Sequence, residues 1–282
     1  MGFLFPVGAA ILQAGSFIVD KITLSVKRMN YKKYAAISFP LIFFFTLIIF
    51  LYFRPPLRVD LLQGKYLLLL LLTIIVMIIT NILFYRALKT DLLSEMEPLS
   101  LLSNIPLILF TSFFFADERN ILIIIMAIIT VVAVVWSHWE RHHLSIAKKT
   151  WPYLIWSLLI APFTGIISKI LLEQWNPISL GLVRDGILAL VFIFLFAKDI
   201  KYLPRKAIPL LLLTNLLTTI AWILYFFSYQ TNGIISTVLI FSLQPLLVYF
   251  ASVIFLKEKF HKKKFIAFLI ILGAITAAQV LG

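Results

Sequence analysis

Residues 66–88 read YLLLLLLTIIVMIITNILFYRAL, an apolar run with a single charged side chain, Arg86. An α-helix needs about 20 apolar residues to cross the roughly 30 Å hydrocarbon core of a bilayer. Similar runs recur along all 282 residues, and 62% of the chain is hydrophobic while 13% is charged. A soluble domain carries about 25% charged residues. The composition therefore excludes a soluble globular fold and predicts an all-α integral membrane protein.

Charged clusters and helix-breaking residues divide the chain into ten apolar spans. The first span has no basic segment before it and no cleavage site after it, so we expect it to stay in the mature protein. The connector 141–150 separates one five-span unit, residues 1–140, from a second, residues 151–282. The ten predicted transmembrane helices lie near residues 3–24, 36–53, 66–88, 92–115, 121–138, 152–172, 177–197, 207–229, 234–256 and 264–281.

The basic residues that produce the net charge of +13 are distributed unevenly among the connectors. Eighteen of the 25 lie in or beside odd-numbered connectors, while Arg54, Arg58, Lys65 and Arg119 lie in even-numbered ones. By the positive-inside rule the odd connectors are cytoplasmic and both termini are extracytoplasmic, which requires three of those four to be translocated with the second connector. Because the charges form short clusters between apolar runs, membrane lipids are the expected partners and nucleic acid is not.

The two halves of the chain resemble each other. Residues 84–119 align with residues 224–259 at an offset of 140, which pairs Tyr85 with Tyr225. Five spans are an odd number, so the second half must enter the membrane in the opposite orientation. The sequence thus predicts two inverted five-helix repeats, an arrangement in which many secondary transporters place the substrate site near the midplane between the halves.

Each half ends in an apolar span with a central proline, an acidic–basic pair at residues 118–119 or 258–259, and a last apolar span. This ending resembles the EamA family of the drug/metabolite transporter superfamily, and so does the stretch PISLGLVRDGILAL, in which Arg184 stands at the family's frequent arginine. The family often has glycine where this chain has Asp117 and Lys257. The resemblance covers nearly the whole chain and implies a transporter. It also implies a ten-helix basket in which spans one to four and six to nine surround a cavity, while spans five and ten pack outside.

Polar and aromatic side chains recur at steps of three, four and seven residues in several spans, which places them on one face of each helix. Polar groups are costly in lipid, so these faces should contact protein or a water-filled cavity. The aromatic residues would suit a flat ring or an organic cation. The predicted substrate-binding residues are Gln13, Asp20, Asn81, Tyr85, Glu97, Asn104, Arg184, Asp185, Trp222, Tyr225 and Gln244.

Several of these residues have an equally good structural interpretation. Arg184 and Asp185 lie deep in a span and either contact substrate or form a structural ion pair. Glu97 either binds a cation or proton or pairs with a nearby basic residue. We expect Glu97 and Arg184 to face each other across the transport path. The amides of Asn81, Asn104 and Gln244 are as suited to helix–helix hydrogen bonds as to ligand contacts.

These patterns predict a secondary active transporter in the cell membrane. As a monomer it would move a small organic metabolite, such as an amino acid, a derivative or an organic cation, by alternating access. Protons or a counter-substrate are further possible partners, and no cofactor or metal site is expected. The alternative is an intramembrane enzyme or a flippase acting on a lipid-linked substrate. The sequence has no cysteine, no G-x-S-x-G, no H-E-x-x-H and no P-loop, which disfavours the enzyme.

Overall fold

The computed structural model describes residues 3–140, 143–144, 148 and 150–281, and most of the predicted connector 141–150 lies outside these residues. The fold is helical apart from one short antiparallel hairpin, β1–β2, in which Trp139 pairs with Leu144. The elements are α1 Leu4–Ser25, α2 Tyr31–Phe53, η1 Val59–Leu61, α3 Gly64–Thr90, α4 Leu93–Ser100, η2 Leu101–Ser103, α5 Asn104–Phe114, η3 Ala116–Glu118, α6 Ile121–His138, β1 Trp139–Glu140, β2 His143–Leu144, α7 Trp151–Leu172, α8 Pro177–Phe196, η4 Ala197–Asp199, η5 Arg205–Ala207, α9 Ile208–Asn232, α10 Ile234–Phe241, α11 Leu243–Phe255 and α12 Lys262–Leu281.

Two of the predicted spans are broken helices. The predicted span 92–115 is divided into α4 and α5 by the 3₁₀ turn η2, and the predicted span 234–256 is divided into α10 and α11 at Ser242. Each break comes within five residues before a proline, Pro106 or Pro245. A proline has no N–H for the helical bond to the carbonyl four residues earlier, and its ring clashes with that carbonyl. The predicted span 234–256 is still one segment long and apolar enough to cross a membrane, Ile234–Phe255, whereas only the shorter apolar segment Leu101–Phe114 represents the span 92–115.

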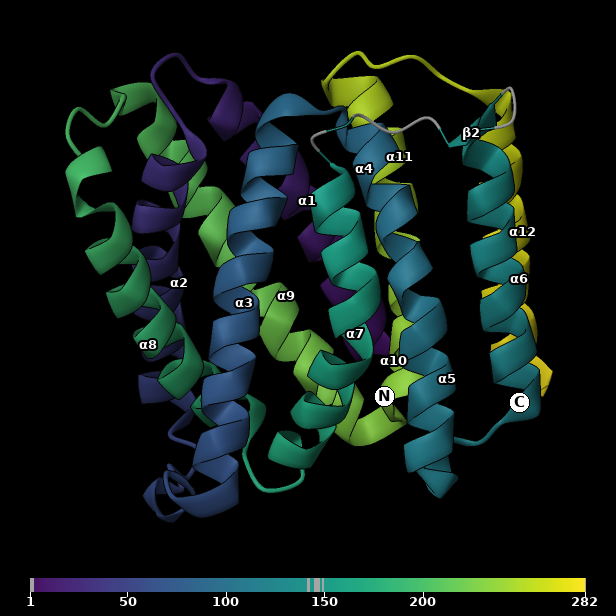
Figure 1. Ribbon diagram of the computed structural model, residues 1–282, viewed down its shortest axis with the longest axis horizontal. Helices are drawn as coiled ribbons and strands as arrows, with labels where there is room; N and C mark the ends of the chain where they lie inside the picture. The colour runs from purple at the N-terminus through teal and green to yellow at the C-terminus, as the bar shows by residue number, and fades with distance from the viewer. Residues whose placement is uncertain (1–2, 141–142, 145–147, 149, 282) are drawn as a thin grey trace.

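The helices stand side by side, and their direction alternates along the chain (Figure 1). The connections α1–α2, α3–α4, α6–α7, α8–α9 and α11–α12 lie at one end of the molecule, at the top of the view, and the two chain termini lie toward the other end. Among the described residues, seven helical segments are long and apolar enough to cross a membrane. Two shorter apolar segments are Leu101–Phe114 and Ile121–Ser137.

Each half of the chain packs mainly against the other half. Helix α1 packs on α9, α2 on α8, α3 on α7, and α4 on α11. Ring stacking contributes to the α2–α8 contact, where the centroids of Phe39 and Phe192 are 4.2 Å apart. Helices α6 and α12 pack on each other at one side of this group, as Figure 1 shows.

Large apolar side chains cover much of the outside. Phe194 is 86% exposed and Phe113 is 73% exposed. Contiguous apolar surface of this kind is unfavourable in water and favourable against lipid tails. The helices and their surface together describe a multi-pass membrane protein.

Candidate functional site

A cavity of about 350 Å³ lies among α1, α2, α3, α5, α7, α8 and α9. Ligand pockets in proteins typically enclose about 300–1,000 Å³ and combine apolar walls with a few placed polar groups. Both halves of the chain contribute side chains to the wall. Nine of the predicted site residues line this cavity: Gln13, Asp20, Asn81, Tyr85, Asn104, Arg184, Asp185, Trp222 and Tyr225.

Asp20 lies on α1 and is 2% exposed. The hydroxyls of Tyr34 and Thr214 both donate hydrogen bonds to its Oδ1, so α2 and α9 hold the carboxylate in place. One turn earlier on α1, the hydroxyl of Ser16 lies 2.6 Å from that of Thr218. A carboxylate removed from water needs such donors, because an isolated charge is costly in an apolar interior.

Arg184 and Asp185 form a buried ion pair on α8. Arg184 Nη2 lies 2.9 Å and Nε 3.0 Å from the same oxygen, Asp185 Oδ1. The hydroxyl of Thr46 donates to Asp185 Oδ2 at 3.0 Å. The guanidinium also lies over the ring of Phe226, 5.0 Å from its centroid, which is cation–π geometry. The two residues thus form an ion pair with each other in the wall of the cavity.

Aromatic side chains form much of the cavity wall. Trp222, Tyr225 and Phe226 follow one another on α9, and the hydroxyl of Tyr225 lies 2.9 Å from that of Tyr229. Elsewhere in the wall, the ring of Phe84 contacts those of Phe17 and Tyr153, with centroid distances of 5.1 Å and 5.5 Å. Edge-to-face and tilted ring contacts at these distances stabilise the arrangement.

Glu97 and Gln244 do not line the cavity. Glu97 lies on α4, which packs against α11, and Gln244 Nε2 donates to Glu97 Oε2 at 3.1 Å. Glu97 Oε1 is buried and has no hydrogen-bond partner in the described part of the chain. The expectation that Glu97 faces Arg184 was wrong, because α4 ends before the break and its residues face a different neighbour from those of α5. Asn104, after the break, lines the cavity and lies 3.5 Å from Ser242 Oγ.

Sequence reasoning missed several residues of the site. Tyr34 and Thr214 hold Asp20, Thr46 holds Asp185, and Phe226 covers Arg184. Thr214 lies one helical turn before Thr218 on α9, so polar periodicity along this helix points to it. Phe226 and Tyr34 carry no such signal, because aromatic residues are frequent throughout the chain.

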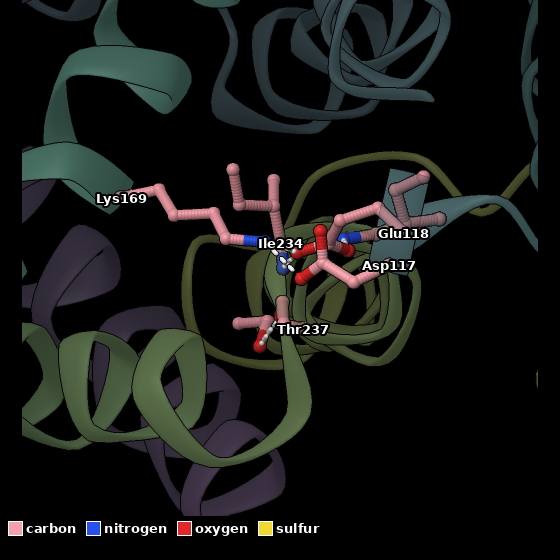
Figure 2. A network of polar contacts seen from close by, with 7 residues as sticks. Asp117, Glu118, Lys169, Ile234 and Thr237 are labelled. Carbon is pink, nitrogen blue, oxygen red and sulfur yellow. Dashed lines mark hydrogen bonds and ion pairs between the residues drawn. The ribbon is translucent and has the colours of Figure 1, made fainter. Parts of the chain in front are cut away.

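A polar network joins the halves at the end of the molecule where the even-numbered connections lie. Lys169 Nζ on α7 contacts Asp117 Oδ2 at 2.7 Å and Glu118 Oε1 at 2.8 Å. Glu118 also accepts hydrogen bonds from the backbone N–H of Ile234 at 2.8 Å and of Ile235 at 3.1 Å, so it caps α10 (Figure 2). The hydrogen bond from Lys169 holds the pKa of Asp117 below its usual value. We call this set the Lys169 network.

A related contact lies near the opposite end. Lys21, at the same place in its half as Lys169, donates to the carbonyl oxygens of Leu88, at 2.7 Å, and Asp91. It also interacts electrostatically with Glu258, the repeat partner of Glu118. Both lysines therefore bind protein groups near a helix end.

Comparison with known proteins identifies the second half of the chain. Residues 150–278 match the EamA-like transporter family. This segment, slightly less than half of the chain, is similar to that family. The EamA-like segment includes α8 with its Arg184–Asp185 pair and α9 with its aromatic wall. The family consists of membrane transporters and not of enzymes.

A solved structure, named only "Crystal structure of protein", superposes with a TM-score of 0.70 over 99% of this chain and 96% of that chain, at 14% sequence identity. At this identity the likeness shows the fold alone. No curated protein matches the sequence.

Proposed function

We propose that this protein is a secondary transporter that moves a small organic metabolite across the cell membrane by alternating access. The observation that carries the proposal is the cavity, which combines polar and aromatic side chains from both halves within a body of apolar helices. Proteins of this class bind their substrate near the midplane, where the two halves meet. The cavity residues named above are the proposed substrate site.

The proposed architecture has ten transmembrane helices, formed by inverted repeats at residues 1–140 and 151–282. The packing supports this: exchanging each span for its repeat partner turns the α1–α9 contact into the α7–α3 contact. The same exchange returns the α2–α8 and α6–α12 contacts to themselves, and it turns the α4–α11 contact into the α10–α5 contact. The two broken helices and the two lysine–glutamate contacts also occupy matching places in the halves.

Charge supports an orientation with both termini outside the cytoplasm. The five connections at one end of the molecule are the odd-numbered ones, which carry most of the connector lysines and arginines. Cytoplasmic loops are enriched in these residues. We propose that the protein works as a monomer, surrounded by membrane lipids.

Alternating access requires contacts that close the cavity at one end while it is open at the other. The Lys169 network joins α7, the α5–α6 connection and the start of α10, and is therefore a candidate closing contact at the even-numbered end. The contacts of Lys21 are its counterpart at the other end. Protons or a counter-substrate would supply the driving force.

Transport by purified protein in liposomes tests this function. Labelled amino acids, organic cations and other small metabolites are offered with and without a pH gradient, and empty liposomes are the control. We expect saturable uptake of one class and accelerated exchange when unlabelled solute is trapped inside. Chemical conversion of a solute without its movement across the membrane would contradict the proposal.

A further inference from the structure

The side chains of the cavity wall carry a net negative charge. Its described lining contains three formally charged residues, Asp20, Arg184 and Asp185, which together give one excess negative charge. Arg184 and Asp185 neutralise each other at 2.9 Å. Among the described residues, Asp20 accepts hydrogen bonds from the hydroxyls of Tyr34 and Thr214 and from no basic side chain. A buried charge without a counter-ion is costly, so a ligand that brings a positive charge is favoured here.

The geometry of Asp20 leaves one oxygen for such a ligand. Both hydroxyls donate to Oδ1, and Oδ2 accepts no hydrogen bond from any residue in the described part of the chain. An ionised carboxylate has about four acceptor sites on its two oxygens. Because Asp20 belongs to the cavity wall, a cation in the cavity can occupy the sites that the protein leaves unused.

Aromatic rings surround the position of Asp20. Phe17 lies one turn earlier on α1, 5.1 Å from Phe84 between ring centroids, and the ring of Tyr85 is 5.2 Å from that of Phe84. Tyr153 continues this wall from α7. The negative faces of aromatic rings attract organic cations, and the attraction grows when water is excluded.

The Arg184 end of the cavity offers little to an anion. Its guanidinium already donates twice to Asp185 and covers the ring of Phe226. Asp185 already balances its charge, so the N–H groups that remain would offer a ligand carboxylate hydrogen bonds without a net positive charge. A zwitterionic amino acid, which needs a cation and an anion site together, is therefore a poorer match than a simple cation.

From this geometry we infer that the cavity binds an organic cation with an aromatic or apolar body, its charged nitrogen at Asp20 Oδ2 and its body along Phe17, Phe84 and Tyr153. The inference rests on the proposed function, because it names the class of solute that the same cavity takes. The volume of about 350 Å³ suits a small cation of one or two rings.

Titration calorimetry on the purified full chain in detergent tests the inference with three ligands that share one ring. These are phenyltrimethylammonium, the zwitterion phenylalanine and the anion benzoate. We expect the cation to bind at least about 10-fold more tightly than the other two, because only the cation gains the contact with a desolvated carboxylate. Tighter binding of phenylalanine or benzoate would overturn the inference.

Two variants locate the charge. Asn can still accept at Oδ1 from Tyr34 and Thr214, so Asp20→Asn removes the charge and keeps these bonds; it should weaken cation binding about 10- to 100-fold. The matched control is Asp60→Asn, since Asp60 is exposed and pairs with Arg58 on a connector. Equal loss in both variants, or none in Asp20→Asn, overturns the inference. Should Asp20→Asn not fold, Phe84→Leu, which removes a ring face, should weaken cation binding several-fold while Asp60→Asn leaves it unchanged, and unchanged binding in Phe84→Leu overturns the inference.

Uptake into proteoliposomes separates this inference from the proposed function. Transport of labelled phenyltrimethylammonium in preference to phenylalanine supports both. Transport of phenylalanine without the cation overturns the cation inference and leaves the transporter function standing. Binding of the cation that depends on Asp20, with no transport of any solute, supports the site and overturns the transporter function.

Discussion

At Arg184 the protein keeps a guanidinium in an apolar interior by placing its counter-ion at the next residue of the same helix. Adjacent residues on a helix do not normally face each other. Here both guanidinium contacts go to one oxygen of Asp185, while Thr46 holds the other oxygen. The pair is 5% exposed at each residue, so neither charge is well solvated.

Removing one member of this pair should therefore be worse than removing both. We expect Arg184→Gln to lower the stability of the purified protein by about 3–5 kcal/mol, because it leaves Asp185 as an uncompensated buried charge. The double variant Arg184→Gln, Asp185→Asn should recover much of that loss. Thermal unfolding in detergent measures both, with Lys198→Gln, an exposed change on η4, as the control. A double variant that is less stable than the single one would contradict this account.

Position 233 requires glycine because of its backbone conformation and because of the close contact with Glu118. Its φ of +77° is unfavourable for other residues, and a Cβ there would lie 2.7 Å from Glu118 Oε1. We expect Gly233→Ala to cost more than about 1 kcal/mol and to disturb the cap of α10. Gly273→Ala is the matched control, since a Cβ at that helical position meets nothing within 4 Å and should be neutral or stabilising by up to about 1 kcal/mol. Thermal unfolding of the two variants side by side decides the point, and equal behaviour would refute it.

At the level of elements, hydropathy located the helices and could not locate their breaks. A window of apolar residues looks the same whether the helix is continuous or interrupted before Pro106 or Pro245. The interruption changes which neighbour a side chain meets, and so Glu97 contacts Gln244 while Asn104 lines the cavity. Periodicity along a single ideal helix cannot anticipate that difference.

The α6–α12 pair tests whether a helix serves packing alone. Small residues allow a close helix contact, and on α12 Ala267 and Ala274 are buried while Gly273 is exposed. We expect Ala274→Leu to cost about 1–3 kcal/mol through overpacking. Because no described residue of α6 or α12 lies in the cavity wall, the apparent affinity for a transported solute should stay unchanged. A large change in apparent KM at normal folded yield would place α12 at the site instead.

At the level of the whole molecule, the odd-numbered connections gather at one end and the termini lie toward the other. We expect a fluorescent protein that folds only in the cytoplasm to stay dark when it is fused after Gly282. The same protein inserted after Lys148 of the full chain, in an odd-numbered connector, should be bright. Fluorescence of whole cells measures both, and a bright C-terminal fusion would reverse the proposed orientation.

Much of the architecture follows from the sequence because lipid is a strict solvent. Each span must be apolar and long enough to cross the bilayer, so hydropathy predicts the helices. The distribution of charge among the connectors predicts their orientation. The site is harder to predict from sequence. Polar spacing identifies Asp20, but it does not identify Tyr34, because that residue comes from another helix. Arg184 illustrates the limit: its burial was predictable from its depth in a span, while its choice of Asp185 over Glu97 depended on how the helices pack.

The cap on α10 has a consequence for how the chain is made. Glu118 and the amide of Ile234 are 116 residues apart in sequence, so the carboxylate enters the membrane long before its partners are synthesised. Until α7 and α10 arrive, Glu118 has neither Lys169 nor a helix end to contact, and the first half carries an unmatched acidic group. The last step of folding is therefore the docking of α7 and α10, which are synthesised later, onto Glu118. A chain truncated after the first half lacks these partners, so we expect it to be degraded.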